Sequence, residues 1–140
     1  MSEETKELTF EELSKLESGT ILVDDYENGV RYLIMRGPCS LCAYVGVPSD
    51  HPLAGKDYDD VPLDCHYGLT FSGEGGDEDF RPAGWYWYGW DYGHSGDKAF
   101  YDVDRDIFRG DTEWTVAMVK QEIWSVTYEF AKLKKLMEAK

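Results

Sequence analysis

The spacing of hydrophobic residues predicts a long helix at the C-terminal end of the chain. Between about residues 112 and 138, apolar side chains recur at alternating intervals of three and four residues: Val116, Val119, Ile123, Val126, Phe130, Leu133 and Met137. This spacing is typical of one buried face of an α-helix. Asp111 or Thr112 can cap the start of this helix, and lysines near its end complement the helix dipole.

A second apolar stripe on the same predicted helix contains Trp114, Met118, Trp124 and Tyr128. The two stripes together are wider than contact with a single sheet requires. Burial on both sides within the monomer is one interpretation of this width, and a homodimer contact is the other.

Shorter apolar segments predict a mainly antiparallel sheet of about five strands. Asn28 and Gly29 form a β-hairpin turn signal between two strand-like segments. The predicted strands are Ile21–Val23, Val30–Met35, Leu41–Val47, Cys65–Ser72 and Trp85–Tyr92. In the last of them, large aromatic side chains alternate onto both faces, so at least one face belongs to the core.

A short helix at about residues 9–18 precedes this sheet, because Thr9 and Glu12 have the spacing of a capping box. The predicted fold class is therefore α+β, with a short N-terminal helix and a long C-terminal helix. We expect residues 1–140 to form a single domain, with a β-rich region at about 20–97 and an acidic connector at 98–111. A chain of 140 residues with 42% hydrophobic residues suits one ordinary core.

The charge of the chain restricts its partners. Its 28 acidic and 14 basic residues give a net charge of -14, which disfavours direct binding to nucleic acid or to an anionic membrane. A basic partner surface is favoured instead. The chain has no apolar run long enough to span a bilayer and no basic start of a signal peptide, so a cytoplasmic location is expected.

Three histidines lie in segments rich in glycine and aspartate: His51, His66 and His94. An imidazole beside a carboxylate is what a general base or a metal site requires, and Asp91 and Asp97 flank His94. The alternative is that each histidine is a turn residue whose ring bonds a backbone carbonyl.

Two metal patterns are incomplete. Cys39, Cys42, Cys65 and His66 supply four zinc ligands, but adjacent strand residues such as Cys65 and His66 point to opposite faces. Asp102, Asp104, Asp106 and Glu113 match positions of a calcium loop, but Ile107 stands where that loop needs glycine. No cofactor is therefore favoured, although a divalent metal stays open.

Four segments together resemble a group of short, uncharacterised proteins encoded by phages and prophages of Gram-positive bacteria. They are Cys42–Pro48 (CAYVGVP), His51–Tyr58 (HPLAGKDY), Cys65–Gly73 (CHYGLTFSG) and Gly89–Asp97 (GWDYGHSGD). The resemblance implies a phage accessory protein in the cytoplasm of the host cell, and many small acidic proteins of that origin bind host machinery or host defence signals. It implies no reaction.

The leading hypothesis is a non-enzymatic binding protein that antagonises a bacterial defence. It would either block a basic nucleic-acid-binding protein surface or sequester a small nucleotide signal. The residues expected to contact the ligand or partner are His51, Lys56, Asp57, Tyr58, His66, Trp87, Asp91, His94 and Asp97. An acidic partner surface would add Asp59, Asp60, Asp77, Glu78 and Asp79.

The alternative hypothesis is a metal-dependent hydrolase of the phosphodiesterase type. In it, His66, Asp91, His94 and Asp97 would hold a divalent ion that activates water. A third interpretation, a structural or regulatory phage protein, treats the histidine motifs as residues that organise loops.

Overall fold

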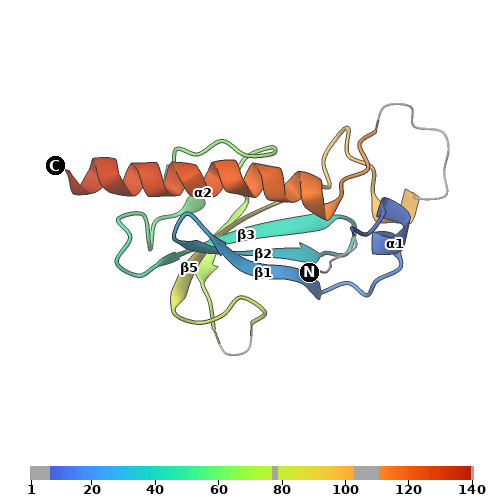
Figure 1. Cartoon of the computed structure of the whole chain (residues 1–140), viewed down its shortest axis with the longest axis horizontal. Coiled ribbons are helices and arrows are strands. Elements are labelled where there is room, and N and C mark those ends of the chain that lie inside the picture. The colour runs from blue at the N-terminus through green and yellow to red at the C-terminus, as the bar shows by residue number, and fades with distance from the viewer. Residues whose placement is uncertain (1–6, 77–78, 103–110, 140) are drawn as a thin grey trace.

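A computed structural model describes residues 7–76, 79–102 and 111–139 of the chain (Figure 1). In chain order, its elements are α1 (Phe10–Ser14), β1 (Thr20–Glu27), β2 (Val30–Arg36), β3 (Leu41–Pro48), the 3-10 turn η1 (Tyr58–Asp60), β4 (Phe71–Glu74), β5 (Trp85–Asp91), the 3-10 turn η2 (Phe100–Asp102) and α2 (Val116–Glu138). The strands of this described part form one antiparallel sheet in the order β1-β2-β3-β5-β4. The predicted α+β fold class is confirmed.

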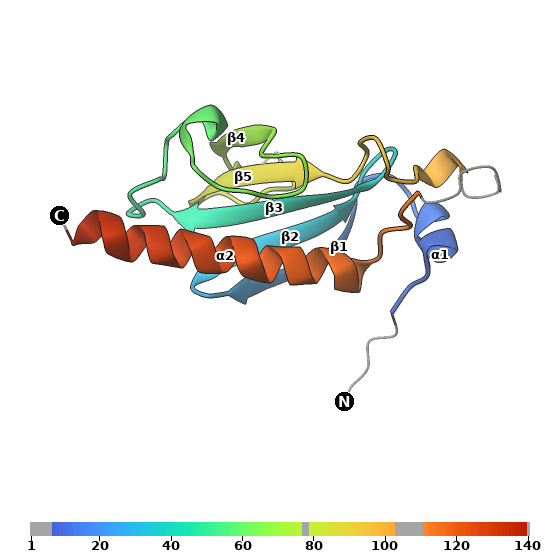
Figure 2. The same ribbon diagram turned by 90° about the horizontal axis from the view of Figure 1, so that it is seen from above.

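Helix α2 lies along one face of the sheet (Figures 1 and 2). Val119, Ile123, Val126 and Phe130 are its buried apolar positions, and they pack in one cluster with alternate residues of β2, β3 and β5. The same side of the sheet also carries the segment 61–70, which runs beside α2 and contributes Leu63, Cys65 and Leu69 to the core (Figure 2). The periodicity in the sequence therefore identified the buried face of α2 correctly.

The first hairpin forms where the sequence predicts it. Asn28 and Gly29 both have positive φ angles, of 53° and 81°, which is the conformation that a tight two-residue hairpin loop requires. The Asn28 side chain also donates a hydrogen bond of 3.1 Å to the hydroxyl of Thr127 on α2. The turn thus joins β1 to β2 and anchors the hairpin to the helix.

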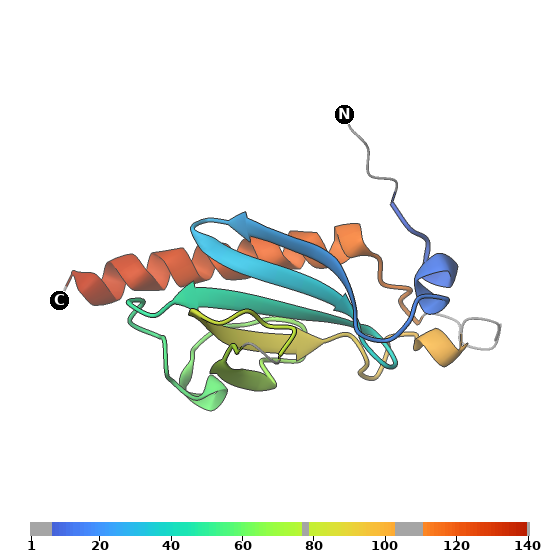
Figure 3. The ribbon, with the colours of Figure 1, turned by 90° about the horizontal axis from the view of Figure 1, so that it is seen from below.

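Residues 79–84 cover the opposite face of the sheet (Figure 3), where the rings of Tyr44, Phe71 and Phe80 form an aromatic cluster. The indole of Trp87 is fully buried, lies against Gly46 and donates to the carbonyl of Pro82 at 3.0 Å. The guanidinium of Arg81 lies over the ring of Phe71, with its carbon 4.0 Å from the ring centroid. Both faces of β5 are therefore buried, each by a different part of the chain.

Arg36 holds α1 against the end of the first hairpin. Its buried guanidinium donates to the carbonyls of Leu13 and Ser14 in α1 and to those of Gly37 and Pro38, and it stacks on Phe100. The bond to Ser14 satisfies a carbonyl that the last turn of a helix leaves without a partner, whereas the carbonyl of Leu13 also accepts the backbone N–H of Leu16. At the other end of α1, the predicted capping box of Thr9 and Glu12 is present.

Three predicted element boundaries are wrong. The strand predicted at Cys65–Ser72 is replaced by β4, which begins only at Phe71, because Tyr67 and Gly68 have φ angles of 59° and 84° and turn the chain. The first helix ends at Ser14 and not near residue 18. Helix α2 begins at Val116 after an N-cap at Thr115, because Thr112 pairs with Asp97 in an isolated bridge.

Some predictions fall on parts of the chain that the structure leaves undescribed. Asp104 and Asp106 of the calcium pattern lie in 103–110, and Asp77 and Glu78 of the acidic surface form the other internal gap. Within the described ranges, none of the helices is long and apolar enough to cross a membrane.

Candidate functional site

Asp97 is the hub of a polar cluster at one end of the sheet. Its side chain is 3% exposed, and its Oδ2 lies 2.7 Å from Nε2 of His66 and accepts the backbone N–H of His94 at 2.9 Å. Its Oδ1 accepts the indole N–H of Trp114 at 2.8 Å. Because an ionised carboxylate only accepts, His66 carries its proton on Nε2 and donates it to Asp97. Segments far apart in sequence are thereby fixed to one another.

Aromatic rings surround the two histidines of this cluster. The ring of His66 stacks on Tyr92 with centroids 4.8 Å apart, and Trp114 lies 4.9 Å from it on another side. The ring of His94 stacks on Tyr67 at 4.5 Å, and the Tyr67 hydroxyl donates to the carbonyl of Ser95. Tyr67 is 59% exposed and therefore covers His94 from the solvent side.

Asp91 completes the set of four residues that the sequence predicts as a metal alternative. Its Oδ1 lies 3.2 Å from Nε2 of His94, in a direction that does not make a hydrogen bond, so this buried nitrogen has no hydrogen-bond partner in the described chain. The structure therefore brings His66, Asp91, His94 and Asp97 together. The two carboxylate oxygens of Asp97 accept hydrogen bonds from three N–H donors. Within the described ranges, no group of three or more His, Cys, Asp or Glu side chains is placed to hold a metal ion.

The cysteines of the zinc pattern are poor ligands. Burial, with Glu122 and Asp64 nearby, raises the pKa of Cys65 to about 12, and burial likewise raises that of Cys42 to about 12. A thiol with such a pKa stays protonated at neutral pH, whereas metal binding needs the thiolate. Cys39 is exposed at the turn before β3.

A second buried polar contact lies beneath the histidine cluster. The hydroxyl of Tyr92 donates to the carboxylate of Glu122 on α2, and the indole N–H of Trp90 donates to that hydroxyl at 2.9 Å. Burial, followed by the hydrogen bond to Glu122, holds the pKa of Tyr92 far above its ordinary value. Tyr92 therefore acts as a neutral donor that ties β5 to the helix.

His51 is not part of this cluster. It is 4% exposed, its Nδ1 accepts the backbone N–H of Leu53 at 3.0 Å, and its Nε2 donates to the carbonyl of Phe130 in α2 at 3.1 Å. Burial lowers the pKa of His51. Its ring is a neutral link between backbone segments, as the alternative interpretation of the histidines expects, and it is not accessible to a ligand.

The remaining predicted site residues are dispersed. Lys56, Asp57, Asp59 and Asp60 are exposed in and beside η1, where the Asp57 carboxylate accepts the backbone N–H of Asp59. The half-buried Tyr58 donates its backbone N–H to Ser72 of β4. The buried Trp87 is closed to any ligand, and Asp79 accepts the Nε–H of Arg81 at 2.8 Å.

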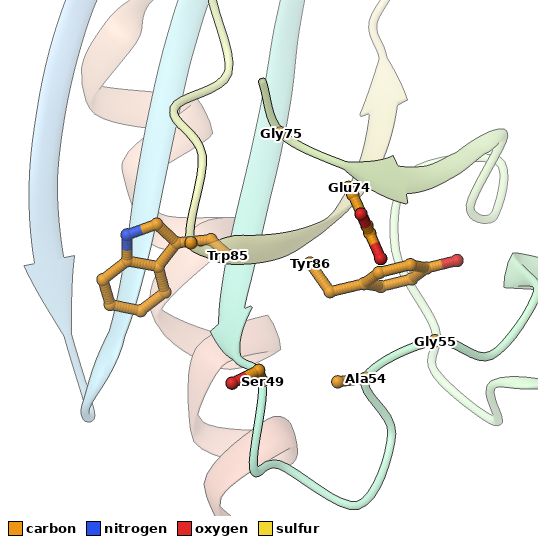
Figure 4. A pocket seen from close by; sticks show the side chains of 8 residues that line it. Ser49, Ala54, Gly55, Glu74, Gly75, Trp85 and Tyr86 are labelled. Carbon is orange, nitrogen blue, oxygen red and sulfur yellow. The ribbon is translucent and has the colours of Figure 1, made fainter. Parts of the chain in front are cut away.

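A hollow of about 360 Å³ lies where β3, β4 and β5 meet the loop after β3 (Figure 4). Its lining includes Ser49, Ala54, Gly55, Glu74, Trp85 and Tyr86. Glu74 and Tyr86 are cross-strand neighbours in the β4–β5 pair, and Figure 4 shows the carboxylate of Glu74 over the ring of Tyr86. Sequence reasoning missed this hollow, because the pairing of β4 with β5 that creates it follows an unpredicted boundary.

A groove of about 430 Å³ lies between α2 and the segment 62–64. Trp124 and Tyr128 form its helical wall, and their rings stack with centroids 5.5 Å apart. Trp124 is 50% exposed and Tyr128 is 47% exposed. Pro62, Leu63 and Asp64 form the other wall, and Glu129 lies beside Tyr128. Of the second apolar stripe, Met118, Trp124 and Tyr128 are thus exposed, whereas Trp114 belongs to the Asp97 cluster.

Comparison with protein-family models, curated proteins and solved structures finds no match. The function of the chain therefore has to be argued from its own side chains.

Proposed function

We propose that the chain is a binding protein that recognises a basic surface on another protein. The groove beside α2 carries this proposal, because it presents two exposed aromatic rings next to carboxylates. A Trp and a Tyr ring are the side chains that most often anchor protein interfaces, and they attract arginine and lysine by cation–π contact. Asp64 and Glu129 line the same groove, where Glu129 pairs with Lys132 at 3.5 Å and the Lys132 ammonium lies 5.9 Å from the centroid of the Tyr128 ring. This ion pair is half exposed, so a cation of the partner can take the place of Lys132. The exposed Asp59 and Asp60 of η1 lie shortly before Pro62 in the chain.

The electrostatic surroundings favour a basic protein over a nucleotide. Asp91, Asp97 and Glu122 lie around the histidine cluster. Lys98, the cation that follows this cluster, is paired with Glu113 at 2.9 Å. A phosphate group placed here would meet three carboxylates, and their repulsion would offset hydrogen bonds from the histidines.

A second copy of the chain is a less suitable occupant of the groove. Two copies of a chain with a net charge of -14 repel each other, and a symmetric contact would bring Asp64 and Glu129 of both copies together. A basic partner instead gains attraction from the same carboxylates. If that partner is a nucleic-acid-binding protein of a host defence, occupation of its basic surface would keep nucleic acid away. Binding to host machinery is what the resemblance to phage proteins implies.

A fluorescent arginine-rich peptide, titrated with the full chain at low and high salt, tests the proposal. We expect binding that weakens steeply with salt, as for an electrostatically steered interface. Replacing both anchors, Trp124→Ala with Tyr128→Ala, leaves the charge unchanged and should weaken binding at least about tenfold, the scale of lost interface anchors.

A matched pair of charge variants separates a defined surface from general attraction. Asp59→Asn with Asp60→Asn removes two charges near the groove, whereas Glu11→Gln with Glu17→Gln removes one charge in α1 and one charge three residues after it. Figure 2 shows η1 as the green turn beside β4, well separated from α1. The first pair should weaken binding more than the second. Equal effects of the two pairs, together with full binding by the double aromatic variant, contradict the proposal, and a dimer whose formation needs Trp124 would assign the groove to a second copy.

A further inference from the structure

The hollow between β3, β4 and β5 places the exposed carboxylate of Glu74 beside the half-buried ring of Tyr86. Glu74 makes no ion pair or side-chain hydrogen bond with any residue in the described part of the chain, and its carboxylate lies over the face of Tyr86 (Figure 4). The face of an aromatic ring is electronegative, so a carboxylate gains nothing from this position by itself. A cation placed in the hollow would contact both groups favourably.

The strand register explains why these two side chains meet. Glu74 pairs directly with Tyr86, so both project from the same face of neighbouring strands. The ring of Tyr86 also packs edge to face with the ring of Tyr88, at 5.3 Å between centroids. The aromatic wall of the hollow is thus fixed by the sheet before any ligand arrives.

The same molecule already contains the complete form of this arrangement. On the opposite face of the sheet, the Nε of Arg81 donates to Asp79 at 2.8 Å while its guanidinium lies 4.0 Å over Phe71. A carboxylate, an aromatic ring and a guanidinium group therefore form one stable unit there. The hollow at Glu74 holds the carboxylate and the ring of such a unit.

We propose that this hollow is a binding site for an arginine side chain of a partner protein. A planar guanidinium can lie flat on Tyr86 and donate two parallel hydrogen bonds to Glu74, which a lysine ammonium cannot do. Ser49 lines the same hollow. The volume of about 360 Å³ admits the whole side chain. The inference rests on the proposed function for the class of partner but uses residues that the groove beside α2 does not share.

Titration of the isotope-labelled full chain with N-acetyl-arginine amide tests this site by NMR. We expect amide shifts at Gly55, Glu74, Gly75 and Tyr86, with saturation. N-acetyl-citrulline amide has the same shape without the charge, and it should bind at least about tenfold more weakly because it loses the charged hydrogen bonds. The lysine analogue should fall between the two.

Two variants make the outcome specific. Glu74→Gln should abolish the shifts, whereas Glu17→Gln, an exposed change on the far side of the molecule, should leave them intact. Tyr86→Leu should weaken binding while keeping the charge. Equal binding of citrulline, or shifts unchanged by Glu74→Gln, would overturn the site. If the arginine-rich peptide binds through Trp124 but N-acetyl-arginine amide causes no shifts in the hollow, only this inference is overturned. If N-acetyl-arginine amide saturates the hollow but the peptide does not bind, the arginine site is supported and the proposed function is overturned.

Discussion

His51 and His66 have different structural roles in the fold. Both ring nitrogens of His51 form hydrogen bonds with buried backbone groups, so the ring connects the loop after β3 to α2. The Nε2–H of His66 donates a hydrogen bond to Asp97, and the ring is partly exposed. The sequence around the two residues is similarly rich in glycine and aspartate, and only long-range packing separates their roles.

The buried His51 makes the stability of the protein depend on pH. Burial lowers the pKa of His51 in the folded state below the ordinary 6.5, at which the ring titrates in the unfolded chain. As the pH falls below 6.5, the unfolded state binds more protons, so the free energy of unfolding decreases by at most about 1.4 kcal/mol for each pH unit. The neutral ring contributes its full share of the free energy of unfolding above pH 6.5. This contribution is lost as the pH falls from 6.5 toward the pKa of His51 in the folded state.

Urea unfolding measured between about pH 7.5 and pH 5 checks this dependence. The variant His51→Gln keeps a side-chain N–H donor but cannot titrate, so its free energy of unfolding should fall less over the same range. His66 and His94 are present in both proteins and cancel in the comparison. Identical slopes for the two proteins would show that His51 is not responsible.

Asp97 should contribute more to stability than an exposed carboxylate. In Asp97→Asn, the single amide oxygen cannot accept from Trp114 and also from His66 and His94. The new NH2 group would face N–H donors of these residues. We expect a loss of about 1–3 kcal/mol in the free energy of unfolding, the cost of an unsatisfied buried polar group. Asp59→Asn is the control, since that side chain is exposed, and equal stability of both variants would contradict the role of Asp97.

At the scale of elements, close packing of β3 on β5 depends on a missing side chain. A Cβ atom at Gly46 would lie 2.9 Å from the indole ring of Trp87, which is itself fully buried. Gly46→Ala should therefore cost about 1–3 kcal/mol through overpacking. Gly76→Ala is the matched control, because a Cβ there meets open space. Denaturant unfolding of the two variants should differ by that amount, and a stable Gly46→Ala protein would mean that the indole ring of Trp87 can move aside.

The elements that the sequence predicted are those with local signals. Thr9 with Glu12, and Asn28 with Gly29, define their turns within a few residues, and the repeat along α2 is set by the helix itself. The start of β4 escaped prediction because the left-handed conformation of Tyr67 has no strong sequence signal. The start of α2 escaped it because Trp114 is held outside the helix by Asp97, a contact between distant segments.

The candidate sites follow the same division. The carboxylates near η1 and the stripe with Trp124 and Tyr128 are visible in the sequence, since charge and helical spacing are local properties. The sequence grouped His66 with His94 among the expected contacts and in the metal alternative without establishing their convergence, and the meeting of Glu74 with Tyr86 is not visible there. Both depend on which strands and loops become neighbours, and the strand order β3-β5-β4 decides that.

For the whole molecule, excess negative charge destabilises the folded chain but favours binding of a basic partner. A net charge of -14 makes the folded chain repel itself, and described cations such as Arg31, Arg81 and Lys98 are already paired with carboxylates. Salt screens this repulsion, so sodium chloride should raise the free energy of unfolding while it weakens binding of the arginine-rich peptide. Urea unfolding and peptide titration across one salt series measure both. Choline chloride should raise stability equally if screening is the cause, whereas a stability that falls with salt would mean that the ion pairs outweigh the self-repulsion.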